Sequence, residues 1–503
     1  MHVFTFVPKE IYQYMTSIPR KINFPFIALI TMIISIGFMG CNDGIYSTNP
    51  NDKLSFSTDT LTFDTVFTSI GSATAKIMVY NRNNVALKIS HIGLAGGKES
   101  SFKINVDGSL NANNQFDNIE IRAKDSMYIF VAVTVDPTNA NSPVVINDSL
   151  VTQTNGVLQN VKLRAYGQNV IILRGKRIKD DTVFKEDIPY LIYDSLIVSQ
   201  NKTLTLNPGC RIYFHNNANM KVYGNLRALG TVEKPIVMRG DRFDKINFST
   251  PVPYNYVAGQ WDGIYLLGNA GNHILRHVNI SSGYVGIYFS NNDRNTIPNL
   301  EISDCRIQNF YFYGLVVQNG NVQVTNTEIS NSSSYSVFLN GGKHSFIQCT
   351  IANYFDNNSF QPVTRDKKPA VMIMNLNRVS PMESIFRNCI ISGNEDNEFS
   401  LATRFPDQYT GTFDHCYIKK TDSLKLIQFT KIRWAQRKDT VFKSIRYNLD
   451  NNTYFNFMPD SVSPARGLAD PTIASQYPLD LNGNNRLKDG APDAGAYEWE
   501  PAK

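Results

Sequence analysis

The feature that most restricts the fold of this chain is a repeat in its second half. Six isoleucines recur at intervals of 27, 22, 22, 40 and 27 residues: Ile280, Ile307, Ile329, Ile351, Ile391 and Ile418. A recurring period of this size indicates a solenoid, and 22 residues fit one coil of short parallel strands. Two positions before each isoleucine stands a second residue of the same repeat: Val278, Cys305, Thr327, Cys349, Cys389 and Cys416. Because side chains alternate along a strand, both columns are predicted to point inward and to stack.

The repeat also accounts for most of the cysteines. Residues one coil apart lie at the sheet spacing of about 4.8 Å, so Cys389 and Cys416 could come into contact if their coils are adjacent. Free cysteine is a small, readily buried hydrophobe. We therefore predict reduced thiols in the core, with a disulfide as the alternative. A zinc or redox centre is not expected, because the sequence has no Cys-x-x-Cys pair.

The interval of 40 residues marks an insertion. A second strand returns about seven residues after a column isoleucine, as at Gly314 and Ser336, but after Ile351 the matching Ala370 comes nineteen residues later. Residues 356–368 are therefore predicted to form a loop. Further insertions are expected at 240–260, at 394–411 and after Lys420. Insertions in solenoids tend to gather on one face, where binding usually occurs.

The segments 203–214 (TLTLNPGCRIYF), 220–237 (MKVYGNLRALGTVEKPIV) and 261–265 (WDGIY) have a motif order that resembles a known superfamily. They are similar to the opening coils of right-handed parallel β-helix proteins of the pectate-lyase-like superfamily. The resemblance implies a right-handed parallel β-helix over residues 201–460. Fold alone does not define a reaction, however.

The C-terminal residues 461–503 include the segments 480–486 (DLNGNNR) and 493–498 (DAGAYE). They resemble the choice-of-anchor segment that ends many secreted β-helix proteins. Asp480, Asn482 and Asn484 match the first half of a calcium loop, but its twelfth position is Ala491 instead of a bidentate glutamate. Turn and cap chemistry is the favoured interpretation, with calcium as the alternative. No other cofactor and no other metal are predicted.

Residues 54–170 alternate between short apolar strands and turn clusters at the spacing of a sandwich. The segments 77–81, 87–92, 102–106 and 163–167 make this range similar to an immunoglobulin-like domain of the bacterial abnormal-spindle and Hydin type, which would act as a spacer or interaction module. Residues 171–200 are predicted to be a connector and N-terminal cap. The whole chain is thus predicted to be all-β, with an immunoglobulin-like β-sandwich followed by a right-handed parallel β-helix solenoid.

The N-terminal residues 1–40 have the charge order of a secretory signal. Arg20 and Lys21 precede the uncharged run 24–39, which is short for a membrane-spanning helix. Residues 38–41 resemble a bacterial lipobox, which implies lipid attachment at Cys41, a linker over 41–53 and a membrane partner held through the lipid. Asn42 favours delivery to the outer membrane of the bacterial cell envelope. The alternative is an uncleaved membrane helix, and Met15 is an alternative start.

The charge distribution argues against a nucleic-acid partner. The leader holds three basic residues and one acid, which leaves +4 of the formal net charge of +6 for the rest of the chain. No block of five or six like charges occurs, so nucleic-acid binding is not expected. Oligomeric state is not predicted.

Candidate binding residues lie in two of the insertions. Tyr254 and Tyr256 could stack on sugar rings, while Trp261 fits the core repeat. In the largest insertion four charged residues could contact an acidic sugar: Arg365, Asp366, Lys367 and Lys368. A solvated loop tip is the alternative for these four.

No catalytic residue can be assigned from the sequence. The acids Asp304, Glu328 and Asp414 are single and scattered, although hydrolysis needs paired carboxylates. Three histidines are expected at turns or on the surface: His277, His344 and His415. The favoured function is binding of an extended ligand by the β-helix, with a polysaccharide as the expected ligand and no assigned catalysis. The alternatives are a polysaccharide lyase or glycoside hydrolase with an atypical site, and an adhesin or structural surface protein.

Overall fold

The computed structural model of the chain describes residues 46–137, 143–246, 252–267, 271–291, 299–357, 360–376, 381–420, 424–447 and 454–501. Within them, helix is confined to α2 (Pro471–Ala474) and the short 3-10 helices η1 (Gly97–Glu99), η2 (Tyr254–Tyr256), η3 (Phe355–Asn357) and η4 (Pro406–Gln408). The all-β class is confirmed. Cys41 lies outside the described residues, as does the leader. No helix among the described residues is long and apolar enough to cross a membrane.

Residues 55–168 form two five-stranded sheets, here called the two-sheet region. The first contains β1 (Ser55–Phe56), β3 (Ala75–Tyr80), β8 (Ser126–Val133), β5 (Phe102–Val106) and β6 (Ser109–Leu110). The second contains β2 (Thr60–Phe67), β10 (Val157–Gln168), β9 (Val144–Thr154), β4 (Leu87–Leu94) and β7 (Gln115–Ile121). Buried side chains of both sheets meet in one core, among them Ile77 and Val131 from the first and Ile89 and Leu163 from the second. Alternation of apolar and polar residues along each strand produces this inward face.

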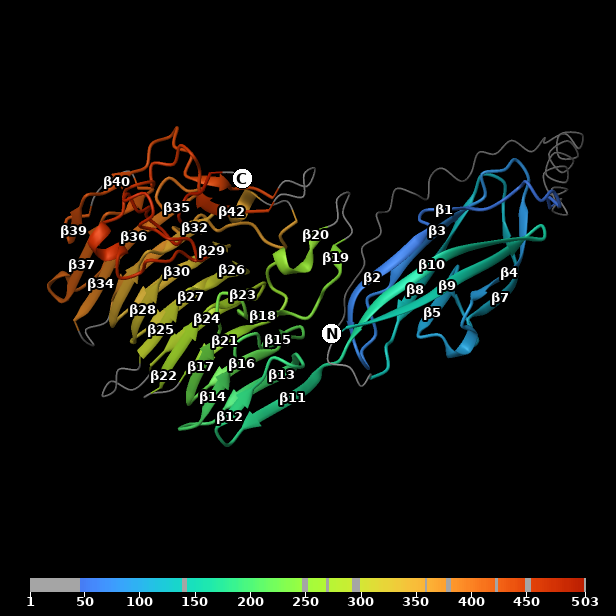
Figure 1. Cartoon of the computed structure of the whole chain (residues 1–503), viewed down its shortest axis with the longest axis horizontal. Coiled ribbons are helices and arrows are strands. Elements are labelled where there is room, and N and C mark those ends of the chain that lie inside the picture. The colour runs from blue at the N-terminus through green and yellow to red at the C-terminus, as the bar shows by residue number, and fades with distance from the viewer. Residues whose placement is uncertain are drawn as a thin grey trace, which may run out of the picture.

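Residues 171–434 form three parallel ladders, here called the ladder region (Figure 1). The first contains β11 (Ile171–Ile178), β13 (Tyr190–Val198), β15 (Arg211–Phe214), β18 (Ile236–Gly240), β23 (Val278–Ser281), β26 (Arg306–Phe310), β29 (Glu328–Ser332), β32 (Thr350–Asn353), β35 (Ile390–Gly393), β38 (Tyr417–Ile418) and β40 (Arg433–Trp434). The second shares β11 and β13 and continues with β16 (Asn219–Val222), β21 (Gly263–Leu266), β24 (Val285–Ser290), β27 (Tyr313–Gln318), β30 (Val337–Asn340), β33 (Val371–Asn375) and β36 (Phe399–Thr403).

The third ladder contains β12 (Thr182–Phe184), β14 (Thr203–Leu206), β17 (Asn225–Leu229), β22 (Asn272–Arg276), β25 (Asn299–Ser303), β28 (Asn321–Thr325), β31 (Lys343–Ile347), β34 (Met382–Arg387), β37 (Tyr409–Asp414) and β39 (Ile427–Thr430). Successive passes of the chain add a strand to each ladder in turn. The long parallel sheets are compatible with the predicted β-helix.

The predicted isoleucine column is present in register. Ile280 pairs with Ile307, and the pairing continues through Ile329, Ile351, Ile391 and Ile418, all of them buried. The second column is also buried, and three of its side chains, Cys305, Thr327 and Cys416, accept a backbone N–H group of the neighbouring coil. The Cys416 Sγ atom lies 3.4 Å from the Cys389 nitrogen. Five cysteines are free and buried, as predicted: Cys210, Cys305, Cys349, Cys389 and Cys416.

The parallel pairing begins earlier than the sequence suggested. Residues 171–200 were expected to be a connector and cap, yet β11 pairs with β13 from Ile171 onward. The reason is that β11 and β13 each belong to two ladders. The pairing of β11 with β13 shifts register between Arg174 and Lys176, and β13 pairs first with β15 and then with β16. The register shift of β11 lies at Gly175 (φ 53°), and Asp194 (φ 61°) lies between the two parts of β13 that pair with different strands.

The C-terminal segment packs on the outside of the first ladder. The Ala496 N–H donates to the Thr350 hydroxyl at 2.9 Å, and the Arg306 guanidinium donates to Asn482 at 2.6 Å. The Asp480 carboxylate accepts the backbone N–H groups of Asn482, Asn484 and Glu498 at 2.7 to 2.9 Å. Asp480 therefore has the turn role expected of it.

The two-sheet region and the ladder region are in contact. Phe67 at the end of β2 packs against Tyr213 of β15 and Phe243, with ring centroids 5.2 and 5.4 Å apart. Leu191 and Val170 belong to the same apolar cluster. Figure 1 shows the two regions side by side, with β10 leading into β11.

Candidate functional site: an aromatic stripe and an adjoining cleft

A stripe of aromatic side chains lies on the outside of the ladder region, where the chain passes from the first ladder to the second. Neighbouring ring centroids along it are 4.7 to 6.1 Å apart. Phe312 is 43% exposed and the others are half-buried. This aromatic stripe consists of Tyr284, Tyr311, Phe312, Tyr313, Tyr335 and Phe338. It forms a surface of ring faces across three successive coils.

The backbone of the turns explains why these rings line up. A residue in the left-handed conformation bends the chain shortly before each group of rings: Ser282 (φ 63°), Asn309 (φ 62°) and Asn331 (φ 54°). Asparagine tolerates this conformation better than most residues. The turns then stack by hydrogen bonds, as where the Tyr311 N–H donates to the Gly283 carbonyl at 2.9 Å. Equivalent bends on adjacent coils therefore bring the rings that follow them together.

One of the predicted binding residues, Asp366, borders this stripe. The Asp366 N–H donates to the Ser333 carbonyl at 2.8 Å, and burial together with the nearby Asp366 carboxylate raises the pKa of Tyr335. Lys367 and Lys368 follow and are exposed. The stripe thus has a charged edge beside Tyr335.

Arg365 is not part of that surface. Its side chain is fully buried and pairs with the buried Glu398 at 2.5 Å. It was expected as a surface residue for an acidic sugar or as a solvated loop tip, and both expectations are wrong. The loop folds back on the ladder region, so that Arg365 also donates to the Asn353 carbonyl at 2.8 Å.

Tyr256 lies in a cluster formed by three insertions. Its ring stacks on Tyr454 with centroids 4.4 Å apart, and Phe360 and Tyr447 belong to the same cluster. Burial, followed by the effect of Tyr454, raises the pKa of Tyr256 to about 12. Three of the four predicted insertions therefore meet in this cluster, where Tyr256 has a structural role. The fourth, residues 394–411, includes β36 and the start of β37 of the ladder region. Trp261 is fully buried against Phe214, as predicted for a core residue.

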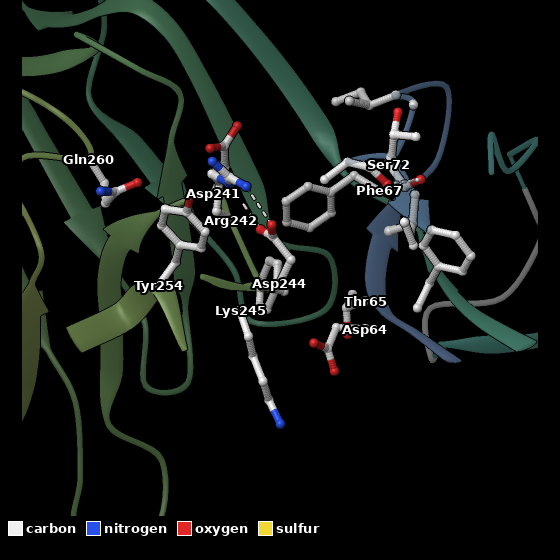
Figure 2. A pocket seen from close by; sticks show the side chains of 18 of the residues that line it. Asp64, Thr65, Phe67, Ser72, Asp241, Arg242, Asp244, Lys245, Tyr254 and Gln260 are labelled. Atoms are coloured by element: carbon white, nitrogen blue, oxygen red, sulfur yellow. Dashed lines mark hydrogen bonds and ion pairs between the residues drawn. The ribbon is translucent and has the colours of Figure 1, made fainter. Parts of the chain in front are cut away.

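A cleft of about 1240 Å³ separates the two-sheet region from the ladder region. Figure 2 shows its two walls, with Asp64, Thr65, Phe67 and Ser72 on one side. The opposite wall carries the labelled residues of the ladder region: Asp241, Arg242, Asp244, Lys245, Tyr254 and Gln260. Tyr254, predicted as a binding residue, lines this cleft.

Two carboxylates in the cleft, those of Asp241 and Asp244, each lie beside a basic side chain. The Arg242 guanidinium donates to both Asp244 oxygens, with one Nε to Oδ1 distance of 2.9 Å, and lies 3.6 Å from the centre of the Tyr254 ring. His215 Nδ1 lies 2.7 Å from Asp241 Oδ2. On the other wall, burial raises the pKa of the Asp64 carboxyl, Lys245 opposes the rise and Asp244 adds to it.

The three predicted histidines differ in their positions. His277 and His415 have left-handed backbone conformations in turns, as expected. His344 is instead buried in strand β31, and its burial lowers its pKa to about 4. The expectation for His344 was wrong because side chains alternate along β31, and this alternation places the His344 ring in the interior together with Phe346. There the two ring nitrogens contact the Gly341 carbonyl and the Ser384 hydroxyl.

Among the residues that the structure describes, one group of side chains has the spacing of a cation site. Asp414, His415 and Asp470 each offer a ligand atom, and these atoms lie within 4.8 Å of one another. His415 Nδ1 is 2.8 Å from Asp414, and Asp470 accepts the Thr472 N–H at the start of α2. The Asp470 N–H also donates to Asn388 Oδ1 at 2.9 Å, which ties the C-terminal segment to the ladder region.

The aromatic stripe could not be assigned from the sequence, although a signal was present. Tyr284 and Tyr311 each lie four residues after a column isoleucine, and Tyr335 lies six residues after one. The unequal spacing hides the stripe from a fixed-period search. A search for aromatic residues within six positions after each column isoleucine would have found the aromatic stripe.

Comparisons with known proteins define no family. No family model matches the chain. A segment of 65 residues is 42% identical to Protein bark beetle of Drosophila melanogaster, covering 13% of this chain and 2% of that relative. The chain therefore spans only a small part of this relative.

Similarity to solved structures is weak. A family 123 glycoside hydrolase from Clostridium perfringens matches 24% of this chain and 30% of its own chain, at 10% identity and a TM-score of 0.17. A PapD-like domain of human CEP192 matches 24% of this chain and 85% of its own chain, at 9% identity and a TM-score of 0.16. These scores support no inference about function.

Proposed function

We propose that this chain is a lipoprotein of the bacterial cell envelope whose ladder region, a right-handed β-helix, binds an extended polysaccharide along the aromatic stripe. The observation that carries the proposal is the unbroken succession of six partly exposed rings over three coils. Aromatic side chains offer a large apolar face with a polar tip, which suits the apolar faces and hydroxyls of sugars. A ladder of such faces fits a polymer better than a small molecule.

In this proposal the two-sheet region is an immunoglobulin-like spacer between an acylated Cys41 and the binding surface. It stands between these two parts in the chain, and its core is separate from that of the ladder region. Metabolic labelling with a fatty-acid analogue should label the protein and fail to label Cys41→Ala. Equal labelling of both would remove the lipid anchor from the proposal.

Isothermal titration of the purified protein against a panel of polysaccharides tests the binding role. Phe312→Ala and Tyr313→Ala should raise the dissociation constant about 10-fold or more, because central aromatic residues dominate most binding surfaces. The matched controls are Tyr128→Ala and Phe130→Ala, which change an exposed aromatic pair of the two-sheet region. They should leave the affinity unchanged.

Two results would contradict the binding role. If no polysaccharide in the panel binds, or if stripe and control variants weaken binding equally, the stripe is not a glycan site. Capture of a defined surface protein by the wild type, lost in Phe312→Ala, would instead favour the adhesin alternative.

The cleft supports a second candidate, a glycoside hydrolase. Hydrolysis needs one carboxyl group protonated and another ionised. Burial raises the pKa of Asp64 above its usual value, while Asp244 in the same cleft is paired with the Arg242 guanidinium. Release of reducing ends that disappears in Asp64→Asn would establish this activity, and no release from any bound glycan would exclude it.

A further inference from the structure

We infer that the cleft receives the end of a neutral glycan whose chain continues along the aromatic stripe. This inference rests on the proposed function of the stripe and adds the class of sugar and the site of its end. It depends on three features of the cleft: its paired charges, its connection to the stripe and its fixed walls.

The paired charges indicate a neutral ligand. The cleft lining carries three carboxylates, Asp64, Asp241 and Asp244, and three cationic side chains, Lys76, Arg242 and Lys245, so its formal charges balance. Within this set Asp244 is paired with Arg242, and Asp241 lies 2.7 Å from His215 Nδ1. Compensated pairs give little long-range attraction for a charged sugar. They do, however, place hydrogen-bond donors and acceptors side by side. Adjacent sugar hydroxyls, which both donate and accept, match such pairs.

Tyr254 supplies an apolar surface next to these polar groups. Arg242 covers part of its ring at 3.6 Å, and both side chains line the cleft. A small number of polar groups around an aromatic face is the usual composition of a site for a small polar ligand. The cleft volume of about 1240 Å³ is large enough to hold the end of a polymer chain and not just one of its side groups.

Gly259 and Gln260 connect the cleft with the stripe. Both line the cleft, and their N–H groups donate to the carbonyls of Gly283 and Ser282 at 3.1 and 2.7 Å. A Cβ atom on Gly259 would lie 3.1 Å from the Tyr311 ring and 3.6 Å from the Tyr284 ring. The stripe therefore begins directly beside the cleft wall, and one extended ligand can occupy both.

The opposite wall is fixed in place by the contact between the two regions. Phe67 is buried against Tyr213 and Phe243, and Phe243 also lines the cleft. A cleft with walls held by such packing is formed before the ligand binds, which lowers the entropic cost of binding. A flexible gap between two domains would lack this property.

The test compares neutral with uronate-containing oligosaccharides of equal length by isothermal titration at 50 and 500 mM salt. We expect the neutral series to bind, with less than a twofold change in affinity between the two salt concentrations. Preference for the acidic series, with at least tenfold weaker binding at high salt, would overturn the inference.

Variants separate the cleft from the stripe. Tyr254→Ala and Asp241→Asn should each weaken binding of a neutral octasaccharide about 10-fold, with unchanged unfolding temperatures. Asp117→Asn is the matched control, because Asp117 forms a comparable pair with His91 at 2.9 Å in the two-sheet region. It should have no effect on binding.

The results also distinguish the inference from the proposed function. If Phe312→Ala weakens binding but Tyr254→Ala and Asp241→Asn do not, the stripe is a glycan site and the inference about the cleft is wrong. If a cleft variant unfolds at a lower temperature, Gln260→Ala replaces it, with the same expected loss of affinity. If neither stripe nor cleft variants change binding, both ideas fail.

Discussion

Arg365 and Glu398 form a buried ion pair in which two guanidinium nitrogens donate to the two carboxylate oxygens, at 2.9 and 2.5 Å. Both side chains are fully buried. The carboxylate oxygens of Glu398 also accept hydrogen bonds from the backbone N–H groups of Ala370 and Glu395, at 2.8 and 2.7 Å. The pair thus joins the largest insertion to the loop after β35 and holds the charged edge of the aromatic stripe in place.

Breaking this pair from one side should destabilise the protein strongly. Arg365→Met leaves a buried carboxylate without its cation, and Glu398→Gln leaves a buried guanidinium, so each should lower the free energy of unfolding by about 3–5 kcal/mol. Urea unfolding followed by circular dichroism measures the loss. Glu301→Gln is the control, since the half-exposed pair of Glu301 and Arg276 should contribute about 1 kcal/mol or less. Equal losses for buried and exposed pairs would contradict the assignment.

The buried cysteines should be chemically silent in the folded protein. Burial raises the pKa of Cys210 and of Cys305 to about 12, and the thiolate is the reactive form. In a Cys41→Ser background, Ellman's reagent should titrate none of the five core thiols in buffer and all five in guanidinium chloride. Fewer than five thiols after unfolding without reductant would indicate a disulfide and contradict the assignment of free thiols.

These cysteines also show how much of the fold the sequence can predict. Cys389 and Cys416 were placed on one inward column because strand alternation and the isoleucine period together determine which face a residue occupies. Both are buried and in adjacent coils. A repeat predicts its own core well, because every coil makes the same contacts with the next.

The binding surface was less predictable because it depends on contacts between segments far apart in the sequence. Arg365 was taken as a surface residue, since nothing near it in the sequence indicates that Glu398 of the next coil covers it. The cleft is a similar case, because residues 61–67 and 70–76 of one region face residues 241–245, 254, 259 and 260 of another. No local period relates these two segments.

Stability should depend on pH through Glu498 in the C-terminal segment. Burial, followed by the effect of Asp493, raises the pKa of this carboxyl to about 8 in the folded protein, above its usual value of 4.5. The folded state then holds a proton that the unfolded state releases above about pH 4.5, so stability falls as the pH rises from there through 8. Urea unfolding at pH 5, 7 and 9 measures this fall, and Glu498→Gln should flatten it. An identical pH profile for the variant would show that Glu498 is not the group responsible.

The contact between the two regions should determine whether they unfold together. Phe67→Ala removes the ring that packs on Tyr213 and Phe243, a loss of about 3–5 kcal/mol for a buried phenylalanine. Because Phe67 belongs to the small cluster between the regions and not to either main core, we expect the two cores to remain folded and to unfold in two separate transitions. Differential scanning calorimetry resolves them, and limited proteolysis should cut faster between β10 and β11. Phe130→Ala, an exposed ring of the two-sheet region, should leave the calorimetric trace unchanged. A trace for Phe67→Ala that matches the wild type would mean that other contacts hold the two walls of the cleft together.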